Sequence, residues 1–183
     1  MIMTQNDSPS LHRPPQVGAS FLLSQVGAHG AGMFEDRLAP LELKPHHAGL
    51  LRMLGTNPGL SQQEMSELFG VFPSRLVELL DQLEARQFIE RRANPQDRRG
   101  HRVFLTRRGR GALQRIARLT RQLDDDLTAA LNADEREQLC SLLRRVVSQQ
   151  KITPAVHPAY RKLREAAAPQ PKKRTRTAPQ ETL

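Results

Sequence analysis

The sequence predicts a mainly α-helical fold with one small β-hairpin. Six segments carry apolar residues at the spacing of three and four that marks a buried helical face. Two short extended stretches, separated by a turn, follow the fourth segment. Proline gathers near both ends of the 183-residue chain. We therefore expect a disordered N-terminal tail over 1–18, a folded domain over 19–151 and a basic, proline-rich disordered tail over 152–183.

Two helices are expected before the first break, over about 20–38 and 45–55. The first contains three glycines, which weaken an isolated helix, so it needs packing partners. Pro45 opens the second because proline is favourable at the first helical position. Pro58 and Gly59 then break the chain.

Two short helices follow, over 62–69 and 73–86. Ser61 and Glu64 have the spacing of a capping box, which marks the start of the first helix. Gly70 suits the left-handed residue that ends it. Two short helices joined by a tight glycine turn indicate a helix-turn-helix.

The stretches 88–92 and 101–105 are expected to form two strands. Between them lie eight residues, in which Asn94-Pro95 starts a turn and Gly100 closes it. A β-hairpin directly after a helix-turn-helix predicts a winged helix, with a DNA-binding lobe over about 45–106.

Two long helices are expected next, over about 107–131 and 133–150, with Thr106 and Asn132 as N-caps. A small lobe cannot cover their leucine-rich stripes. We therefore expect the dimerisation helices, 20–38 and 107–150, to form a homodimer interface. The alternative is an internal three-helix packing without a partner.

Positive charge is concentrated in two regions. Residues 91–110 carry a net charge of +7 and residues 151–183 carry +6, whereas the rest carries −4, which gives +9 in total. Such basic clusters commonly bind polyanions. A solubilising surface is the alternative, and it applies mainly to the tail. Aromatic residues make up only 4%, which argues against reading single strands by base stacking.

The first residues of a recognition helix reach base edges in the major groove. Here they are Ser74 and Arg75. Three alternatives remain for Arg75: it contacts a guanine edge, it contacts a phosphate, or it faces solvent. Ser74 is expected to reach a phosphate or to help cap the helix.

The hairpin tip carries Asp97, Arg98 and Arg99. We expect Arg98 or Arg99 to enter a minor groove, with Asp97 orienting the guanidinium. Neighbouring arginines are expected to meet phosphates: Arg91, Arg92, Arg102, Arg107 and Arg108. If six to eight phosphates per dimer are neutralised, log affinity should fall against log salt with a slope of roughly −5 to −7.

The run 79–109 resembles the recognition helix and wing of the MarR family of bacterial transcriptional regulators. The matching pieces are Leu83-Glu84, Ile89-Glu90-Arg91, Asp97-Arg98-Arg99 and Leu105-Thr106 with Gly109. The resemblance covers about 20–150. It implies an obligate dimer that binds pseudo-palindromic double-stranded DNA. In many members a small aromatic or phenolic effector weakens that binding.

Some positions depart from the family. Arg75 and Val77 stand where small hydroxyl residues are frequent, so a base preference cannot be carried over. Gln87 stands where glycine is usual at the end of the recognition helix, so we expect that junction to differ slightly. Cys140 lies far from the cysteine of redox-sensing relatives, and we interpret it as a packing residue. A single cysteine cannot form an internal disulfide.

We expect a dimeric repressor released by a small-molecule effector. The alternative is a nucleoid-type architectural protein that binds any duplex. His29, His46 and His47 are candidate effector contacts, although ordinary polar surface is the commoner role. Phosphate loops, nucleophile elbows and metal-ligand spacings are missing, so we expect no enzyme, no cofactor and no metal. With no membrane span or secretory signal, a cytoplasmic, nucleoid-associated protein is expected.

Overall fold

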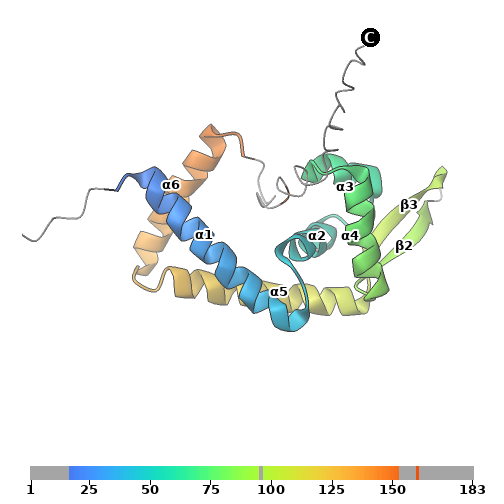
Figure 1. The fold of residues 1–183 in the computed structure, drawn as a ribbon, viewed down its shortest axis with the longest axis horizontal. Helices are drawn as coiled ribbons and strands as arrows, with labels where there is room; N and C mark the ends of the chain where they lie inside the picture. Colours follow the sequence, from blue (N-terminus) through green and yellow to red (C-terminus); the bar gives the residue numbers. More distant parts are fainter. Residues whose placement is uncertain (1–16, 95–96, 153–159, 161–183) are drawn as a thin grey trace, which may run out of the picture.

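The computed structural model describes residues 17–94, 97–152 and 160. The expected mainly helical fold with a small sheet is confirmed. In chain order the elements are α1 (Ala19–Leu38), the short 3-10 helix η1 (Ala39–Leu41), α2 (Pro45–Thr56), β1 (Leu60–Ser61), α3 (Gln62–Phe69), α4 (Pro73–Ala85), β2 (Ile89–Asn94), β3 (Asp97–Leu105), α5 (Arg107–Leu127) and α6 (Ala133–Gln149). Helix α6 and the start of α1 lie at one end of the molecule, a lobe of α2, α3, α4 and the sheet lies at the other, and α5 runs between the two ends (Figure 1).

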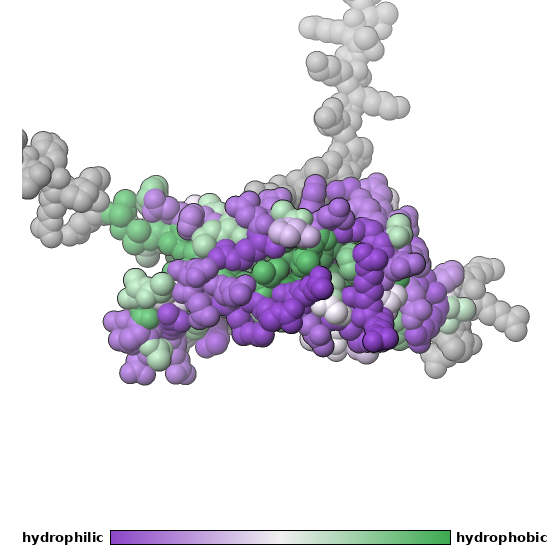
Figure 2. Space-filling model, turned by 90° about the horizontal axis from the view of Figure 1, so that it is seen from below, coloured by the Kyte–Doolittle hydropathy of each residue, from purple (hydrophilic) through white to green (hydrophobic). Residues whose placement is uncertain are grey.

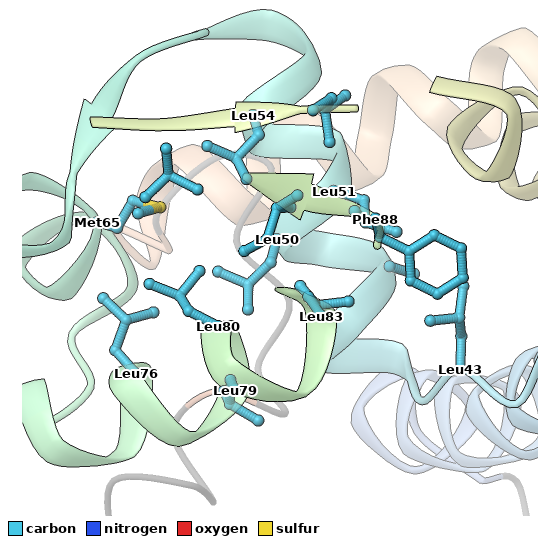
Figure 3. Packing of buried hydrophobic residues seen from close by; sticks show 14 of the residues in the cluster. Leu43, Leu50, Leu51, Leu54, Met65, Leu76, Leu79, Leu80, Leu83 and Phe88 are labelled. Atoms are coloured by element: carbon cyan, nitrogen blue, oxygen red, sulfur yellow. The ribbon is translucent and has the colours of Figure 1, made fainter. Parts of the chain in front are cut away.

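The lobe is held together by apolar side chains from α2, α3, α4 and the sheet (Figure 3). The leucines of α2 and α4 recur every three or four residues, so one face of each helix is apolar throughout. The central side chains are at most 2% exposed: Leu50, Leu51, Leu54, Met65, Leu76, Leu79, Leu80, Leu83, Ile89 and Val103. Full burial of one such side chain contributes about 1.5–3 kcal/mol, so this core fixes how α4 and the hairpin are presented.

The sheet has three antiparallel strands in the order β1-β3-β2. Sequence analysis missed β1, whose Leu60 pairs with Val103. The expected eight-residue loop is also wrong, because the strands continue through it and Ala93 pairs with His101. Only residues 95–96 fall between the strands, and they lie outside the described part. The hairpin is therefore longer than predicted.

Helix α1 packs on α5 at the end away from the hairpin. Gly30 is buried there, and an added Cβ would lie 2.9 Å from Cδ1 of Leu127. Arg37 of α1 forms an ion pair with Asp126 of α5. The fifth helix ends at Leu127, before the expected residue 131, and the Thr128 hydroxyl donates to the Asp124 carbonyl at 2.6 Å. The glycine-containing helix thus has the packing partner that it needs.

Helix α6 buries none of its residues within the chain. Leu139, Leu142 and Val146 on its apolar side are exposed, and so is Cys140. The expected packing role of Cys140 is therefore not fulfilled within one chain. The start of α1 is equally uncovered, with exposed apolar side chains including Phe21, and Figure 2 shows apolar residues gathered there. Within the described residues, α6 is thus not buried in an internal three-helix packing, and its apolar side is left for a partner chain.

Candidate nucleic-acid interface and effector cleft

The helix-turn-helix is set by local hydrogen bonds. The Glu64 amide donates to the Ser61 hydroxyl at 3.2 Å, and the Ser61 amide donates to the Glu64 carboxylate at 2.7 Å. The expected capping box is therefore present. Gly70 adopts the expected left-handed conformation, with φ of 60°. Pro73 then starts α4 as predicted.

The first turn of α4 presents Ser74 and Arg75. Ser74 is exposed, and the half-buried Arg75 forms an ion pair with Glu78, three residues further along the helix. A pair that faces solvent contributes less than about 1 kcal/mol. Arg75 can therefore exchange Glu78 for an anionic group on a partner at little cost.

Arg92 and Arg102 lie opposite each other in the β2–β3 ladder, which places both side chains on one face of the sheet. The Arg92 guanidinium is 4.6 Å from the centre of the Phe104 ring and forms an ion pair with Glu90. Arg102 donates to the Gly59 carbonyl at 2.9 Å. Both arginines are thus oriented by the lobe, and Arg92 remains exposed.

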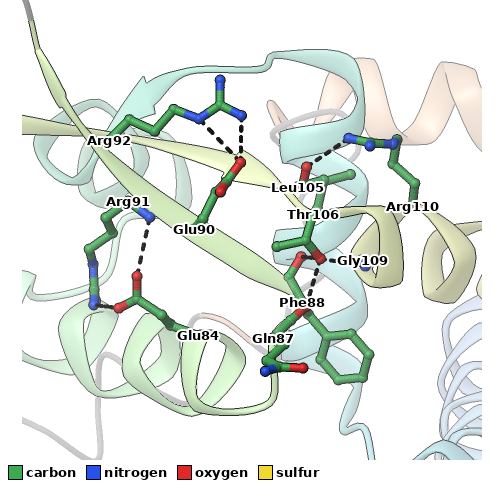
Figure 4. A network of polar contacts seen from close by, with 10 residues as sticks. All are labelled: Glu84, Gln87, Phe88, Glu90, Arg91, Arg92, Leu105, Thr106, Gly109 and Arg110. Atoms are coloured by element: carbon green, nitrogen blue, oxygen red, sulfur yellow. Dashed lines mark hydrogen bonds and ion pairs between the residues drawn. The ribbon is translucent and has the colours of Figure 1, made fainter.

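Arg91 lies on the other side of the strand and is engaged within the chain (Figure 4). Its guanidinium is 2.6 Å from the Asp81 carboxylate and also forms an ion pair with Glu84, both on α4. The Arg91 amide donates to Glu84 at 3.2 Å. Arg91 was expected to meet phosphates, but instead it fastens the wing to the recognition helix. This pairing also neutralises two carboxylates that would repel DNA.

The tip residues Asp97, Arg98 and Arg99 belong to the backbone of β3. Their side chains lie outside the described part of the chain. The roles predicted for these three residues therefore stay predictions.

The base of the wing is joined to α5 by a compact junction (Figure 4). The Thr106 hydroxyl donates to the Gln87 carbonyl at 2.6 Å and accepts from the Gly109 amide at 3.0 Å. A Cβ on Gly109 would overlap the Phe88 carbonyl, so only glycine fits. Gln87 adopts the left-handed conformation, with φ of 60°, at a cost of about 1 kcal/mol. The expectation that this junction differs slightly from that of the family stays a prediction.

A cleft of about 390 Å³ lies where α1 and α5 meet α2. Apolar residues dominate its walls, with Arg52 and Thr120 as polar members and Phe34, Ile116 and Leu123 among the others. This combination suits a small, partly apolar ligand. His29, His46 and His47 are not among the residues that line this cleft. Sequence analysis missed Arg52 and Thr120 because neither stands in a recognisable motif.

The two adjacent histidines support α2. The Lys44 amide donates to Nδ1 of His47 at 3.2 Å, and Nε2 of His47 lies 2.9 Å from Oε1 of Gln82. Both ring nitrogens of His47 thus have partners inside the chain. Burial lowers the pKa of His47 and lowers the pKa of His46 to about 4. Both rings are therefore neutral near pH 7, whereas His29 is simply exposed on α1.

Tyr160 is the residue that sequence analysis missed most completely. It lies in the expected C-terminal tail, yet it is only 1% exposed. Its ring stacks on Phe69 with centroids 4.4 Å apart, and its hydroxyl donates to the His46 carbonyl. An added Cβ on Gly49 would overlap the Tyr160 hydroxyl. Tyr160 is the only tyrosine in a chain that has no tryptophan, and this was the feature of the sequence that could have pointed to it.

Acidification is expected to destabilise the lobe through His46. Burial, followed by the charges of His47, Arg75 and Lys44, lowers the pKa of His46 to about 4 from 6.5. As the pH falls, His46 is protonated in the unfolded chain before it is protonated in the folded one, because its pKa is higher in the unfolded chain. The free energy of unfolding therefore has its full value above about pH 6.5 and declines as the pH falls toward 4. The loss amounts to at most about 3 kcal/mol.

Urea unfolding of wild type and His46→Gln at about pH 5 and pH 7.5 tests this dependence. The variant should lose less stability between the two pH values, because all other titrating groups are shared. Equal losses in both proteins would contradict the role of His46.

Other kinds of site find no support within residues 17–94, 97–152 and 160. No helix there combines the length and apolar character needed to cross a membrane. In the same part of the chain, His, Cys, Asp and Glu form no group of three able to hold a metal.

The MarR family model matches residues 43–101. The chain is 37% identical over 107 residues to a Thauera aromatica protein named "Putative transcriptional regulatory protein for hcr operon", covering 58% of this chain and 64% of that protein. It is 30% identical over 128 residues to the HTH-type transcriptional repressor Rv2887 of Mycobacterium tuberculosis (strain ATCC 25618 / H37Rv), covering 70% and 92% of the two chains.

The fold is shared with a regulator solved on DNA. The transcriptional repressor CouR, bound to a 23-mer DNA duplex, is 32% identical with a TM-score of 0.63, covering 71% of this chain and 92% of that chain. These relatives are named as transcriptional regulators, not as enzymes. The identity to the mycobacterial repressor over nearly its whole length, together with the winged helix-turn-helix, shows that this chain belongs to the MarR family of DNA-binding transcriptional regulators.

Proposed function

We propose that the protein is a dimeric repressor that binds a pseudo-palindromic duplex operator and leaves it when a small effector occupies the cleft. The observation that carries the proposal is one lobe that presents both the exposed first turn of α4 and a cationic hairpin. Arg91 ties these two elements together through Asp81 and Glu84. Helix and wing therefore meet DNA as one rigid unit.

Dimerisation supplies the second half of the interface. The uncovered apolar sides of α6 and of the start of α1 lie at the end of the molecule away from the hairpin (Figure 1). Pairing through that end leaves two lobes free. Their recognition helices must then lie about 34 Å apart to enter successive major grooves on one face of DNA.

The cleft is placed to change this spacing. It lies between α2 of the lobe and helices α1 and α5 of the dimerisation end. A bound ligand that favours another lobe position by a few kcal/mol empties the operator. Small aromatic acids are the class we favour, because Arg52 offers a cation beside the apolar walls.

Competition binding with the protein's own upstream DNA tests the repressor. The upstream duplex should bind at least about a thousandfold more tightly than random duplex at physiological salt. Equal affinity for both duplexes would overturn the proposal in favour of a nucleoid-type protein. Nothing in the structure or in the relatives favours that alternative.

Titration of the complex with salicylate or benzoate tests the effector. We expect the acid to release DNA, and we expect Arg52→Met to need more acid while binding DNA normally without it. Release that is unchanged in Arg52→Met would contradict the assignment of the cleft.

A further inference from the structure

We propose that Glu78 sets a base preference of the recognition helix, because its carboxylate accepts a hydrogen bond from a cytosine amino group in each operator half-site. This role rests on the proposed function only in taking a duplex operator as the partner. It adds the residue that selects a base and the base that it selects.

Glu78 lies at the centre of the outward face of α4. The leucines that hold this helix in the lobe are all fully buried: Leu76, Leu79, Leu80 and Leu83 (Figure 3). Successive residues of a helix are rotated by about 100°, so the side opposite these leucines carries Ser74, Glu78, Asp81 and Ala85, which are all exposed. Glu78 is also in the N-terminal half of α4, the half of a recognition helix that reaches base edges.

The other two acids of α4 are engaged by the wing. Asp81 and Glu84 both form ion pairs with Arg91 of β2, so their charges are neutralised inside the lobe. Glu78 is the remaining acid of the helix, and its side chain is 57% exposed. A carboxylate that loses its water in the groove costs binding free energy unless it finds a partner there.

Arg75 prepares Glu78 for this approach. Its guanidinium forms an ion pair with Oε2 of Glu78, because residues three apart are neighbours on a helix surface. The cation offsets the repulsion between the carboxylate and the phosphates, whether it contacts the carboxylate or a phosphate. In the part of the chain that the structure describes, Oε1 of Glu78 takes part in no hydrogen bond. This oxygen is left to accept from a base.

The chemistry of the major groove selects cytosine as the donor. An ionised carboxylate only accepts hydrogen bonds, and the amino groups exposed in this groove are N4 of cytosine and N6 of adenine. Adenine carries the acceptor N7 beside its amino group, and N7 repels a carboxylate. Cytosine carries a C–H group at that place. Glu78 therefore favours cytosine, and a mismatched base pair of this kind typically lowers affinity by a factor of about 5 to 150.

Selection from a randomised duplex library with the full-length protein tests this preference. Wild type should enrich cytosine at one position of each half-site, and replacing that base pair in one half-site should lower affinity at least about fivefold. Glu78→Ala should lose the preference at this position alone. Glu78→Gln, which keeps the size of the side chain, should prefer adenine there, because glutamine binds N6 and N7 of adenine.

A double-mutant cycle tests the part that Arg75 plays. Arg75→Met leaves the charge of Glu78 without compensation, so it should lower affinity for the selected duplex. The loss should be at least about twofold smaller when Glu78 is already glutamine. Equal losses in the two backgrounds would contradict the compensation by Arg75.

Glu67→Ala is the matched control for Glu78→Ala. Glu67 is an exposed acid on α3 that accepts a hydrogen bond from Gln63, so its replacement removes the same charge from the neighbouring helix. This variant should select the same site as wild type.

The contrary outcomes keep the two proposals apart. If Glu78→Ala binds every duplex more tightly and keeps all preferences, the carboxylate only repels phosphates and the inference is overturned. A change confined to a position where wild type selects another base overturns the assignment of cytosine. Failure of wild type to enrich any sequence overturns the repressor instead.

Discussion

Replacing Arg98 and Arg99 together with glutamate is expected to lower operator affinity by more than a hundredfold while leaving the protein folded and dimeric. The substitution reverses four charges per dimer at the tip of the hairpin and so lowers the net charge of the dimer by eight. Each arginine that contacts DNA typically contributes about 1–3 kcal/mol, and both half-sites lose their contacts. The core that fixes the hairpin includes Ile89 and Val103 at its base. Fluorescence anisotropy with labelled operator measures the loss.

The salt dependence separates phosphate contacts from a general loss of charge. Wild type should show a slope of roughly −5 to −7, and Arg98→Ala with Arg99→Ala should be shallower by up to about 4, because up to four cations per dimer no longer displace counterions from the duplex. Arg115→Glu with Arg118→Glu is the matched control for the glutamate variant of Arg98 and Arg99. Arg115 and Arg118 are exposed on α5, and their replacement changes the net charge by the same amount away from the hairpin. A similar loss in the control, or none in the wing variant, would contradict a direct role for the wing.

The fold could be predicted where local chemistry decides it. Ser61, Gly70 and Asn132 act within a few residues of themselves, so their caps are readable from sequence and are confirmed. The strand β1 has only two residues and forms because β3 passes beside it, as the pairing of Leu60 with Val103 shows. No local pattern marks such a strand. The length of the hairpin was missed for a related reason, since a run of arginines hides the alternation of a strand.

The candidate site likewise contains residues whose position could be predicted from the sequence and residues whose role could not. The exposed position of Ser74 and Arg92 follows from the order of helix, turn and hairpin, which the sequence indicates. The role of Arg91 depends on the carboxylates of Glu84 and Asp81, which lie on α4, seven and ten residues earlier in the chain. Tyr160 donates to a carbonyl 114 residues earlier in the chain. Contacts over such distances depend on tertiary packing, which the periodicity of a single segment does not contain.

Placing a charge on the uncovered side of α6 is expected to abolish both dimerisation and tight operator binding. Leu142 is 47% exposed in the single chain. Leu142→Asp puts two carboxylates into the symmetric interface, where each unpaired buried charge costs several kcal/mol. A monomer keeps one recognition helix and one wing, and so only about half of the binding free energy. Specific complexes in this class bind at about 10⁻⁸ to 10⁻¹¹ M, so the affinity should fall by roughly a thousandfold or more.

Analytical ultracentrifugation measures the association, and operator binding is measured on the same samples. Ser148→Asp supplies the control, because it adds the same charge on the opposite side of α6. It should remain dimeric and bind normally. The lobe of Leu142→Asp should keep its thermal transition, since no residue of α6 is fully buried in the described part of the chain. A dimeric Leu142→Asp, or a monomer that still binds the whole operator tightly, would show that the two half-sites are not read by a pair of chains joined through this helix.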